Sequence, residues 1–171
     1  MFSVGDKIMY GGTGVCVVED IITRRTQEPA SERLYYVLKP LFQSGTIQTP
    51  VDITKIPIRP VMSRNAAEEF IQTIPTVPGE VCAEKNLSAL RNYYQEMMNS
   101  YEAADLIRVA KSVYAKKRDV ESRQKKIGMT DTQYLKRAED LLFGELSIAL
   151  EIPKQSVLPY ILDRVGNAYS E

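Results

Sequence analysis

The chain begins with two short apolar runs that are typical of paired β-strands. Apolar and polar residues alternate on either side of a glycine-rich stretch at residues 11–14. Glycine tolerates the backbone angles that a tight reversal requires, and this stretch lacks the Lys-Ser/Thr pair of a phosphate-binding loop. We therefore interpret residues 11–14 as a turn at the start of a small, bent β-barrel. The apolar positions are Val4, Ile8, Tyr10, Val15, Val17, Ile21 and Ile22.

Three more extended segments follow in the first third of the chain. Residues 34–39 and 46–51 are rich in β-forming residues, and residues 56–61 carry prolines that suit an edge strand. Turn-forming stretches at residues 26–32 and 43–45 separate these segments. The pattern predicts a barrel of four or five short strands.

Near Ser63 the spacing of the apolar residues changes from that of a strand to that of a helix. Ser63 or Asn65 can cap a first helix, which residues 74–79 end with two prolines and a glycine. Helical spacing then returns over about residues 88–98 and 101–124.

Two further helices are predicted in the last part of the chain. Thr130 and Gln133 have the spacing of a capping box, and Gly128 is placed to end the helix before it. A last short helix is expected after Pro153, ending near Val165. The predicted fold class is α+β, with a barrel domain followed by an all-helical domain. We place these domains at residues 1–63 and 64–171.

Composition limits the classes of protein to which the chain can belong. It has 171 residues, 44% of them hydrophobic, and its 22 basic residues equal its 22 acidic residues. No apolar stretch approaches the roughly 20 residues that span a bilayer, and the N-terminus lacks the features of a signal peptide. We expect a cytoplasmic protein that does not enter membranes.

The residue types argue against an enzyme. The chain has no histidine, which excludes Ser-His-Asp and Cys-His catalysis. Cys16 and Cys82 lack metal-binding spacing and are expected to be free thiols. Glu139, Asp140 and Glu145 point to different faces of one predicted helix, so they form no metal site. We therefore expect no catalytic site, no metal, no cofactor and no small-molecule substrate.

Charge is concentrated in one short segment. Residues 108–126 contain eight basic and two acidic residues, whereas residues 1–63 are nearly balanced. One interpretation is a solvated helix face that interacts favourably with the helix dipole. The other is a surface that contacts phosphates and binds nucleic acid without reading its sequence.

Together these features resemble the CarD family of bacterial transcription regulators, whose N-terminal module is shared with transcription-repair coupling factor. The resemblance depends on the order and spacing of several short motifs rather than on a single one. In the first part they are Phe2, Val4, Gly5, Asp6, Tyr10, Gly14, Val15, Tyr35, Tyr36, Val37, Leu38, Thr49, Pro50 and Val51. In the helical part they are Gly128, Met129, Thr130 and residues 141–146.

The resemblance implies a fold and a role. It implies a Tudor-like barrel that docks on the β subunit of RNA polymerase. The helical domain would contact promoter DNA at the upstream edge of the melted region and stabilise the open complex, with no enzymatic activity. An RNA- or ribosome-associated binding module is the alternative, because small barrels also bind RNA.

For polymerase docking, the resemblance points to particular residues. Arg24 or Arg25 matches a docking arginine of the family, and Gln48 stands where relatives have a second one. An amide cannot form the bidentate pair that arginine makes with a carboxylate, so docking would either be weaker or depend on Arg24, Arg25 and Lys39.

For DNA binding, the resemblance points to the start of the helix near residue 88. Leu87 occupies the position of a tryptophan that wedges into the minor groove in some relatives. Leu87 is either such a wedge or a core residue that opens its helix. Arg91, one turn further on, could reach a phosphate. The remaining DNA-binding candidates are the basic residues Lys116, Lys117, Arg118, Arg123, Lys125 and Lys126.

Overall fold

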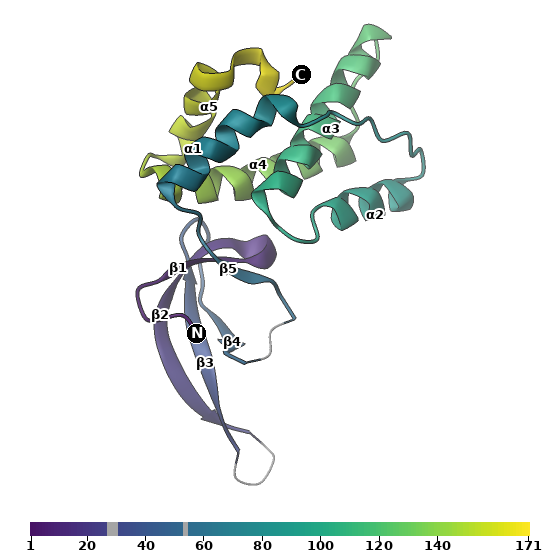
Figure 1. Cartoon of the computed structure of the whole chain (residues 1–171). Coiled ribbons are helices and arrows are strands. Elements are labelled where there is room, and N and C mark those ends of the chain that lie inside the picture. Colours follow the sequence, from purple (N-terminus) through teal and green to yellow (C-terminus); the bar gives the residue numbers. More distant parts are fainter. Residues whose placement is uncertain (27–30, 53–54) are drawn as a thin grey trace. The chain divides into compact units, whose positions relative to one another are not determined.

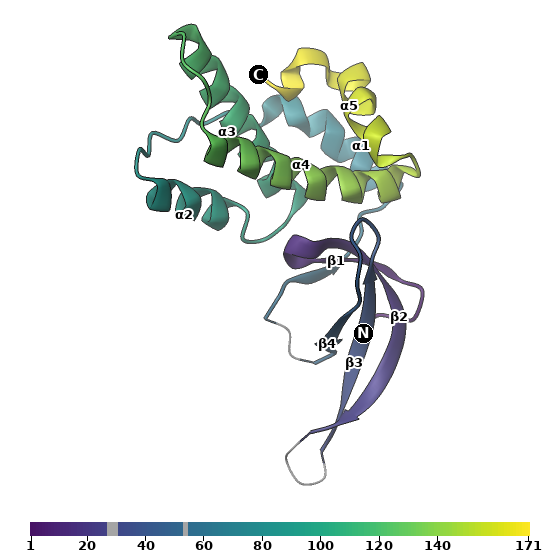
Figure 2. The same cartoon turned by 180° about the vertical axis from the view of Figure 1, so that it is seen from behind.

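The chain forms two compact units. The computed structural model describes residues 1–26, 31–52 and 55–171. The first unit is Met1–Val61, made of strands, and the second is Met62–Glu171, made of helices (Figures 1 and 2). The α+β class is therefore confirmed, and each unit is described below by itself.

Five strands of the first unit form one antiparallel sheet in the order β4-β3-β2-β1-β5. Within the described residues the outer strands β4 and β5 do not pair with each other, so the sheet is open and the prediction of a closed barrel is wrong. The prediction of an edge strand within residues 56–61 is confirmed by β5. The predicted turn at residues 26–32 lies partly outside the described residues. The strands are β1 (Lys7–Tyr10), β2 (Gly14–Arg25), β3 (Glu32–Pro40), β4 (Ile47–Pro50) and β5 (Ile58–Pro60).

The glycine-rich stretch is the predicted turn between β1 and β2. It forms a short 3₁₀ turn, η1 (Gly11–Thr13). Gly11 and Gly14 have φ angles of 42° and 86°, in the region that residues with a side chain rarely adopt. The turn closes the hairpin so that Tyr10 pairs with Gly14.

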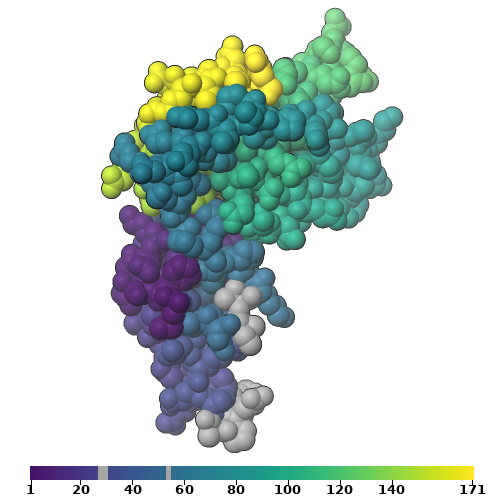
Figure 3. Space-filling model, viewed as in Figure 1, coloured from purple at the N-terminus to yellow at the C-terminus, as the bar shows by residue number. Residues whose placement is uncertain are grey.

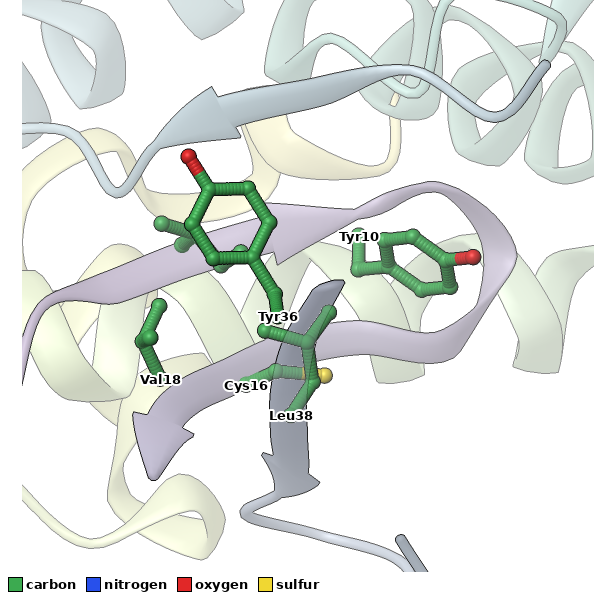
Figure 4. Close-up of a cluster of buried hydrophobic side chains, with 6 residues drawn as sticks. Tyr10, Cys16, Val18, Tyr36 and Leu38 are labelled. Carbon is green, nitrogen blue, oxygen red and sulfur yellow. The ribbon is translucent and has the colours of Figure 1, made fainter. Parts of the chain in front are cut away.

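One face of the sheet carries a hydrophobic core. Figure 4 shows side chains from β1, β2 and β3 meeting on this face. Each of the six central residues is at most 6% exposed. Phe2 packs against this cluster, and its backbone N–H donates to the Tyr36 hydroxyl at 2.8 Å. The six are Ile8, Tyr10, Cys16, Val18, Tyr36 and Leu38.

The second unit contains five α-helices among its described residues. Their bounds agree with the predicted ranges to within a few residues, and the longest two, α3 and α4, pack against each other. The helices are α1 (Arg64–Thr73), α2 (Leu87–Met97), α3 (Ala103–Ser122), α4 (Met129–Leu150) and α5 (Val157–Val165). Short 3₁₀ turns, η2 (Ile74–Thr76), η3 (Lys154–Ser156) and η4 (Gly166–Tyr169), complete the unit.

Two of the predicted helix boundaries are confirmed and two are wrong, the capping box at Thr130 and the end of the preceding helix at Gly128. Ser63 caps α1, since its hydroxyl accepts a hydrogen bond from the Ala66 N–H at 3.1 Å, and α5 ends at Gly166 with a φ of 57°. The capping box at Thr130 does not form. The N-cap of α4 is Gly128, which has an extended backbone and caps without a side chain. The left-handed residue after α3 is instead Gln124, with a φ of 58°.

The apolar stripes of α3 and α4 face the core of the helical unit, as their spacing predicted. Leu106, Val109 and Leu142 are completely buried. Tyr134 of α4 is half-buried and stacks on Tyr94 with ring centroids 5.1 Å apart. The unit therefore has a core of its own.

Candidate protein-docking and nucleic-acid interfaces

The sheet of the first unit has a second face, opposite its hydrophobic core, which we call the outer face. Strand register places Arg24 opposite Arg33, and Gln48 opposite Val37. Side chains directly opposite each other in antiparallel strands lie on the same face, and alternate residues along β3 share that face. Three of the predicted polymerase-binding residues, Arg24, Lys39 and Gln48, therefore lie together on the outer face.

A β-bulge produces this arrangement. The register of β2 against β3 shifts between Val18 and Asp20, which leaves Glu19 as an extra residue. A one-residue shift turns every later side chain of the strand to the other face. Without the bulge, Arg24 would point to the core side of the sheet.

The outer face has an apolar centre and a polar rim. Val17, Ile22 and Val37 are half-buried there, and Arg24 lies over the Tyr35 ring with its guanidinium carbon 5.8 Å from the ring centroid. Such a face, apolar at its centre and charged at its rim, suits contact with another protein surface.

The ion pairs of the rim are all on the surface. Lys39 Nζ lies 3.7 Å from a Glu19 carboxylate oxygen, and Arg33 donates to Asp52 at 2.8 Å. Arg25 is the neighbour of Arg24 in β2 and therefore points to the opposite face of the sheet. Its side chain is 91% exposed, and its Nε lies 3.9 Å from a carboxylate oxygen of Glu32. The structure therefore separates Arg25 from the other three candidates. Surface pairs of this kind are weak, so the arginines and lysine can exchange them for a partner's carboxylates.

The basic segment of the helical unit is not uniformly exposed. Lys111 is 2% exposed, and its ammonium donates to the backbone carbonyl of Val77 at 2.9 Å. Burial lowers the pKa of Lys111, and the charge of Arg118 lowers it further. Ser112 likewise donates to the Glu80 carbonyl, at 2.5 Å. These two residues hold the connector between α1 and α2 against α3 and face away from solvent.

Lys116 is also engaged inside the unit. Its ammonium lies 2.8 Å from Asp131 Oδ1, and the side chains are 16% and 4% exposed. The Tyr94 hydroxyl donates to the same oxygen at 2.6 Å, and burial followed by this hydrogen bond raises the pKa of Tyr94. Lys116 thus links α3 to the first turn of α4, and its role toward DNA stays a prediction.

The remaining basic candidates form an exposed group, which we call the basic tip. They lie in the last turns of α3 and in the residues just after it, a part of the chain that projects beyond the other helices of its unit, in green at the upper right of Figures 1 and 3. Arg123 pairs with Asp119 on the surface, whereas the other four side chains have no ion-pair partner among the described residues. The basic tip comprises Lys117, Arg118, Arg123, Lys125 and Lys126.

Leu87 is a large apolar side chain in solvent. It is the first residue of α2, directly after Asn86, whose side chain accepts hydrogen bonds from the two backbone N–H groups at residues 88 and 89. Leu87 is 58% exposed, so the interpretation of Leu87 as a core residue is wrong. Arg91 follows one helical turn later and is exposed on the same side of α2.

One basic residue beside Arg91 was missed by the sequence analysis. Arg91 of α2 and Arg137 of α4 line the same small pocket, together with Gln133 and Tyr134. The sequence placed Arg137 on a helix but gave no sign that this helix lies beside α2.

The described residues contain no cluster of three or more potential metal ligands. Cys16 and Cys82 are both buried free thiols, and burial raises the pKa of Cys16 to about 11. Among the helices that the structure describes, none is long and apolar enough to cross a membrane.

The chain thus combines a small sheet module, which has an outer face, with a helical module that carries an exposed group of basic residues. The comparison with known families gives the first module its identity. Residues 2–62 match the family model of the CarD-like/TRCF RID domain, so the N-terminal unit belongs to this family. Domains of this family are interaction modules associated with transcription and RNA polymerase. The resemblance to CarD proteins is therefore confirmed for the first unit.

Proposed function

We propose that this protein is a transcription regulator that docks on the β subunit of RNA polymerase and holds promoter DNA. The family of the N-terminal unit supports the docking, and the outer face supplies a surface of suitable chemistry. The strand order β4-β3-β2-β1-β5, with β5 returning to pair with β1, supports a Tudor-like fold for this unit.

The single observation that carries the DNA-binding part is the exposure of the basic tip. Its five cationic side chains project from the end of a helix and are accompanied by only two acidic residues. A group of exposed ammonium and guanidinium groups attracts phosphates through release of counterions, independently of base sequence.

Leu87 gives the proposal a location on DNA. A single exposed leucine is ordinary on a protein surface, and Leu87 is distinguished by its position at the start of α2, one turn before Arg91. There an apolar side chain can pack against an unstacked base step at the edge of melted DNA. The helical unit would therefore stabilise the upstream edge of the open complex by contacting both phosphates and the exposed step.

The test is the lifetime of the open complex on a promoter that forms it transiently. We expect the wild-type protein to lengthen this lifetime, and the double variant Lys117→Glu/Lys125→Glu to lose the effect while still binding polymerase. The matched control is Arg64→Glu/Arg108→Glu, which changes the charge equally at exposed sites away from the tip. An unchanged lifetime with saturating wild-type protein would refute the proposal. Retention on structured RNA without polymerase binding would favour an RNA-associated module instead.

A further inference from the structure

The pocket between α2 and α4 has the chemistry of an anion site. It has a volume of about 200 Å³ and is lined by Arg91, Gln133, Tyr134 and Arg137. Every one of these side chains carries a hydrogen-bond donor, and two of them carry a permanent positive charge. None of the described residues that line the pocket carries a carboxylate.

Among the described residues, the two arginines have no counter-charge. Neither Arg91 nor Arg137 has an ion pair or hydrogen bond to another side chain in the part of the chain that the structure describes. The positions three and four residues from Arg91 on α2 are Leu, Ser, Tyr and Gln. The one acidic neighbour of Arg137 at this spacing, Asp140, pairs with Lys154 at 3.5 Å. Two guanidinium groups on one pocket repel each other, and an anion between them removes this cost.

The walls of the pocket are held in place by buried groups. Tyr134 stacks on Tyr94 with ring centroids 5.1 Å apart, and Tyr94 is itself fixed by its hydrogen bond to Asp131. Both helices are thereby joined directly beneath the pocket. A site with fixed walls loses little conformational entropy when an anion binds.

The size of the pocket indicates what kind of anion it takes. About 200 Å³ is smaller than the roughly 300–1,000 Å³ of pockets that enclose a whole cofactor or metabolite. The arginine side chains remain exposed, so the rest of the ligand can lie outside. These features fit one phosphate group of a larger chain, held by the bidentate geometry that guanidinium groups provide.

We propose that Arg91 and Arg137 together clamp one backbone phosphate of a nucleic acid, with Gln133 and Tyr134 as further donors. This inference rests on the proposed function and assigns a specific contact to it, separate from the basic tip. Leu87 lies one turn before Arg91 on α2, so the clamp would fix the backbone beside the step that Leu87 contacts. The clamp thus positions the DNA, and the tip adds general attraction.

The experiment measures DNA affinity by fluorescence anisotropy over a range of salt concentrations. The probe is a promoter duplex with a short mismatched bubble, and the proteins are the full chain, Arg91→Gln, Arg137→Gln and the double variant. Each phosphate contact contributes about 0.9 to the slope of log K against log salt. Because both arginines hold the same phosphate, we expect each single variant to lower the slope by about 0.9 and the double variant to lower it no further. Arg64→Gln on α1 is the matched control, and thermal unfolding confirms that all variants fold.

The results that would contradict the clamp can be told apart from those that would contradict the proposed function. Variants that bind like Arg64→Gln would eliminate the clamp but leave DNA binding by the basic tip intact. A wild-type protein without salt-dependent DNA binding would eliminate the proposed function as well. A parallel titration with inorganic phosphate at constant ionic strength separates the two sources of the anion. If free phosphate weakens probe binding to wild-type protein but not to the double variant, phosphate and probe compete for the pocket, as the clamp requires. Phosphate binding that leaves the affinity for the probe unchanged would mean that the pocket takes a small anion rather than the nucleic-acid backbone.

Discussion

Lys116 and Asp131 form a nearly buried ion pair, with 2.8 Å between the ammonium nitrogen and Oδ1. The pair joins the middle of the cationic stretch on α3 to the first turn of α4, and Tyr94 of α2 donates to the same carboxylate oxygen. Three helices therefore meet at a single oxygen atom. A lysine that looks like part of a DNA-binding surface in the sequence is thus first of all a structural residue.

The first prediction concerns the stability of this junction. Lys116→Gln leaves the Asp131 carboxylate buried without its counter-charge. Removing one partner of a buried pair costs on the order of 3 kcal/mol, whereas a substitution of an exposed residue stays within about 0.5 kcal/mol. Urea denaturation should therefore show a large loss of unfolding free energy for Lys116→Gln and almost none for Lys117→Gln. Equal losses for the two variants would contradict the structural role.

The second prediction concerns pH. The Tyr160 hydroxyl donates to the Glu68 carboxylate, and Arg164 donates to it at 3.1 Å. The hydrogen bond from Tyr160, followed by the charge of Arg164, lowers the pKa of Glu68 below its ordinary value of 4.5. A carboxylate with a lowered pKa in the folded state stabilises the fold above its ordinary pKa and loses this contribution as the pH falls through the lowered value.

Glu68→Gln should therefore destabilise the protein at neutral pH and less so in acid. The measurement is the free energy of unfolding of both proteins in urea from neutral pH to well below 4.5. The control is Glu69→Gln, which removes an exposed carboxylate next to Glu68. If the difference between wild type and Glu68→Gln stays constant across this range, the contacts of Glu68 do not depend on its charge.

Local chemistry allowed much of the fold to be predicted from the sequence. The Ser63 cap, the glycine-rich turn and the apolar stripes of α3 and α4 depend on residues that are neighbours in the chain or one helical turn apart. The prediction of a capping box at Thr130 was nevertheless wrong, although it too used only neighbouring residues. In the structure α4 begins earlier than this motif predicts, and the Thr132 hydroxyl donates to the Gly128 carbonyl at 3.1 Å.

The parts of the sites that could not be predicted depend on contacts between distant residues. The bulge at Glu19 decides that Arg24 shares a face with Gln48, and nothing in the alternation of residues marks where the register shifts. The partner of Lys116 lies 15 residues away on another helix. Arg91 and Arg137 share a pocket only because α2 packs against α4. Pairing of this kind follows from packing rather than from periodicity.

The third prediction concerns docking on polymerase. Gln48 is exposed on the edge strand β4, on the same face as Arg24. Gln48→Arg supplies a guanidinium that can form a charge-assisted pair with a carboxylate, worth about 1.5–3 kcal/mol, or roughly tenfold or more in affinity. Calorimetry with the isolated β subunit should show tighter binding. Thr23→Arg adds the same charge to the opposite face of the sheet, and equal gains for both variants would show that only net charge matters.

The last prediction separates the wedge from ordinary surface exposure. Leu87 is 58% exposed, so Leu87→Ala should change the free energy of unfolding by less than about 0.5 kcal/mol. It should nevertheless shorten the lifetime of the open complex, because the apolar contact with an unstacked step is lost. Leu87→Trp should lengthen the lifetime, since an aromatic ring offers a larger stacking surface. Leu162→Ala, on α5 and 41% exposed, is the control for loss of a surface leucine. A lifetime that is the same for Leu87→Ala, Leu87→Trp and Leu162→Ala would mean that Leu87 does not contact the melted DNA.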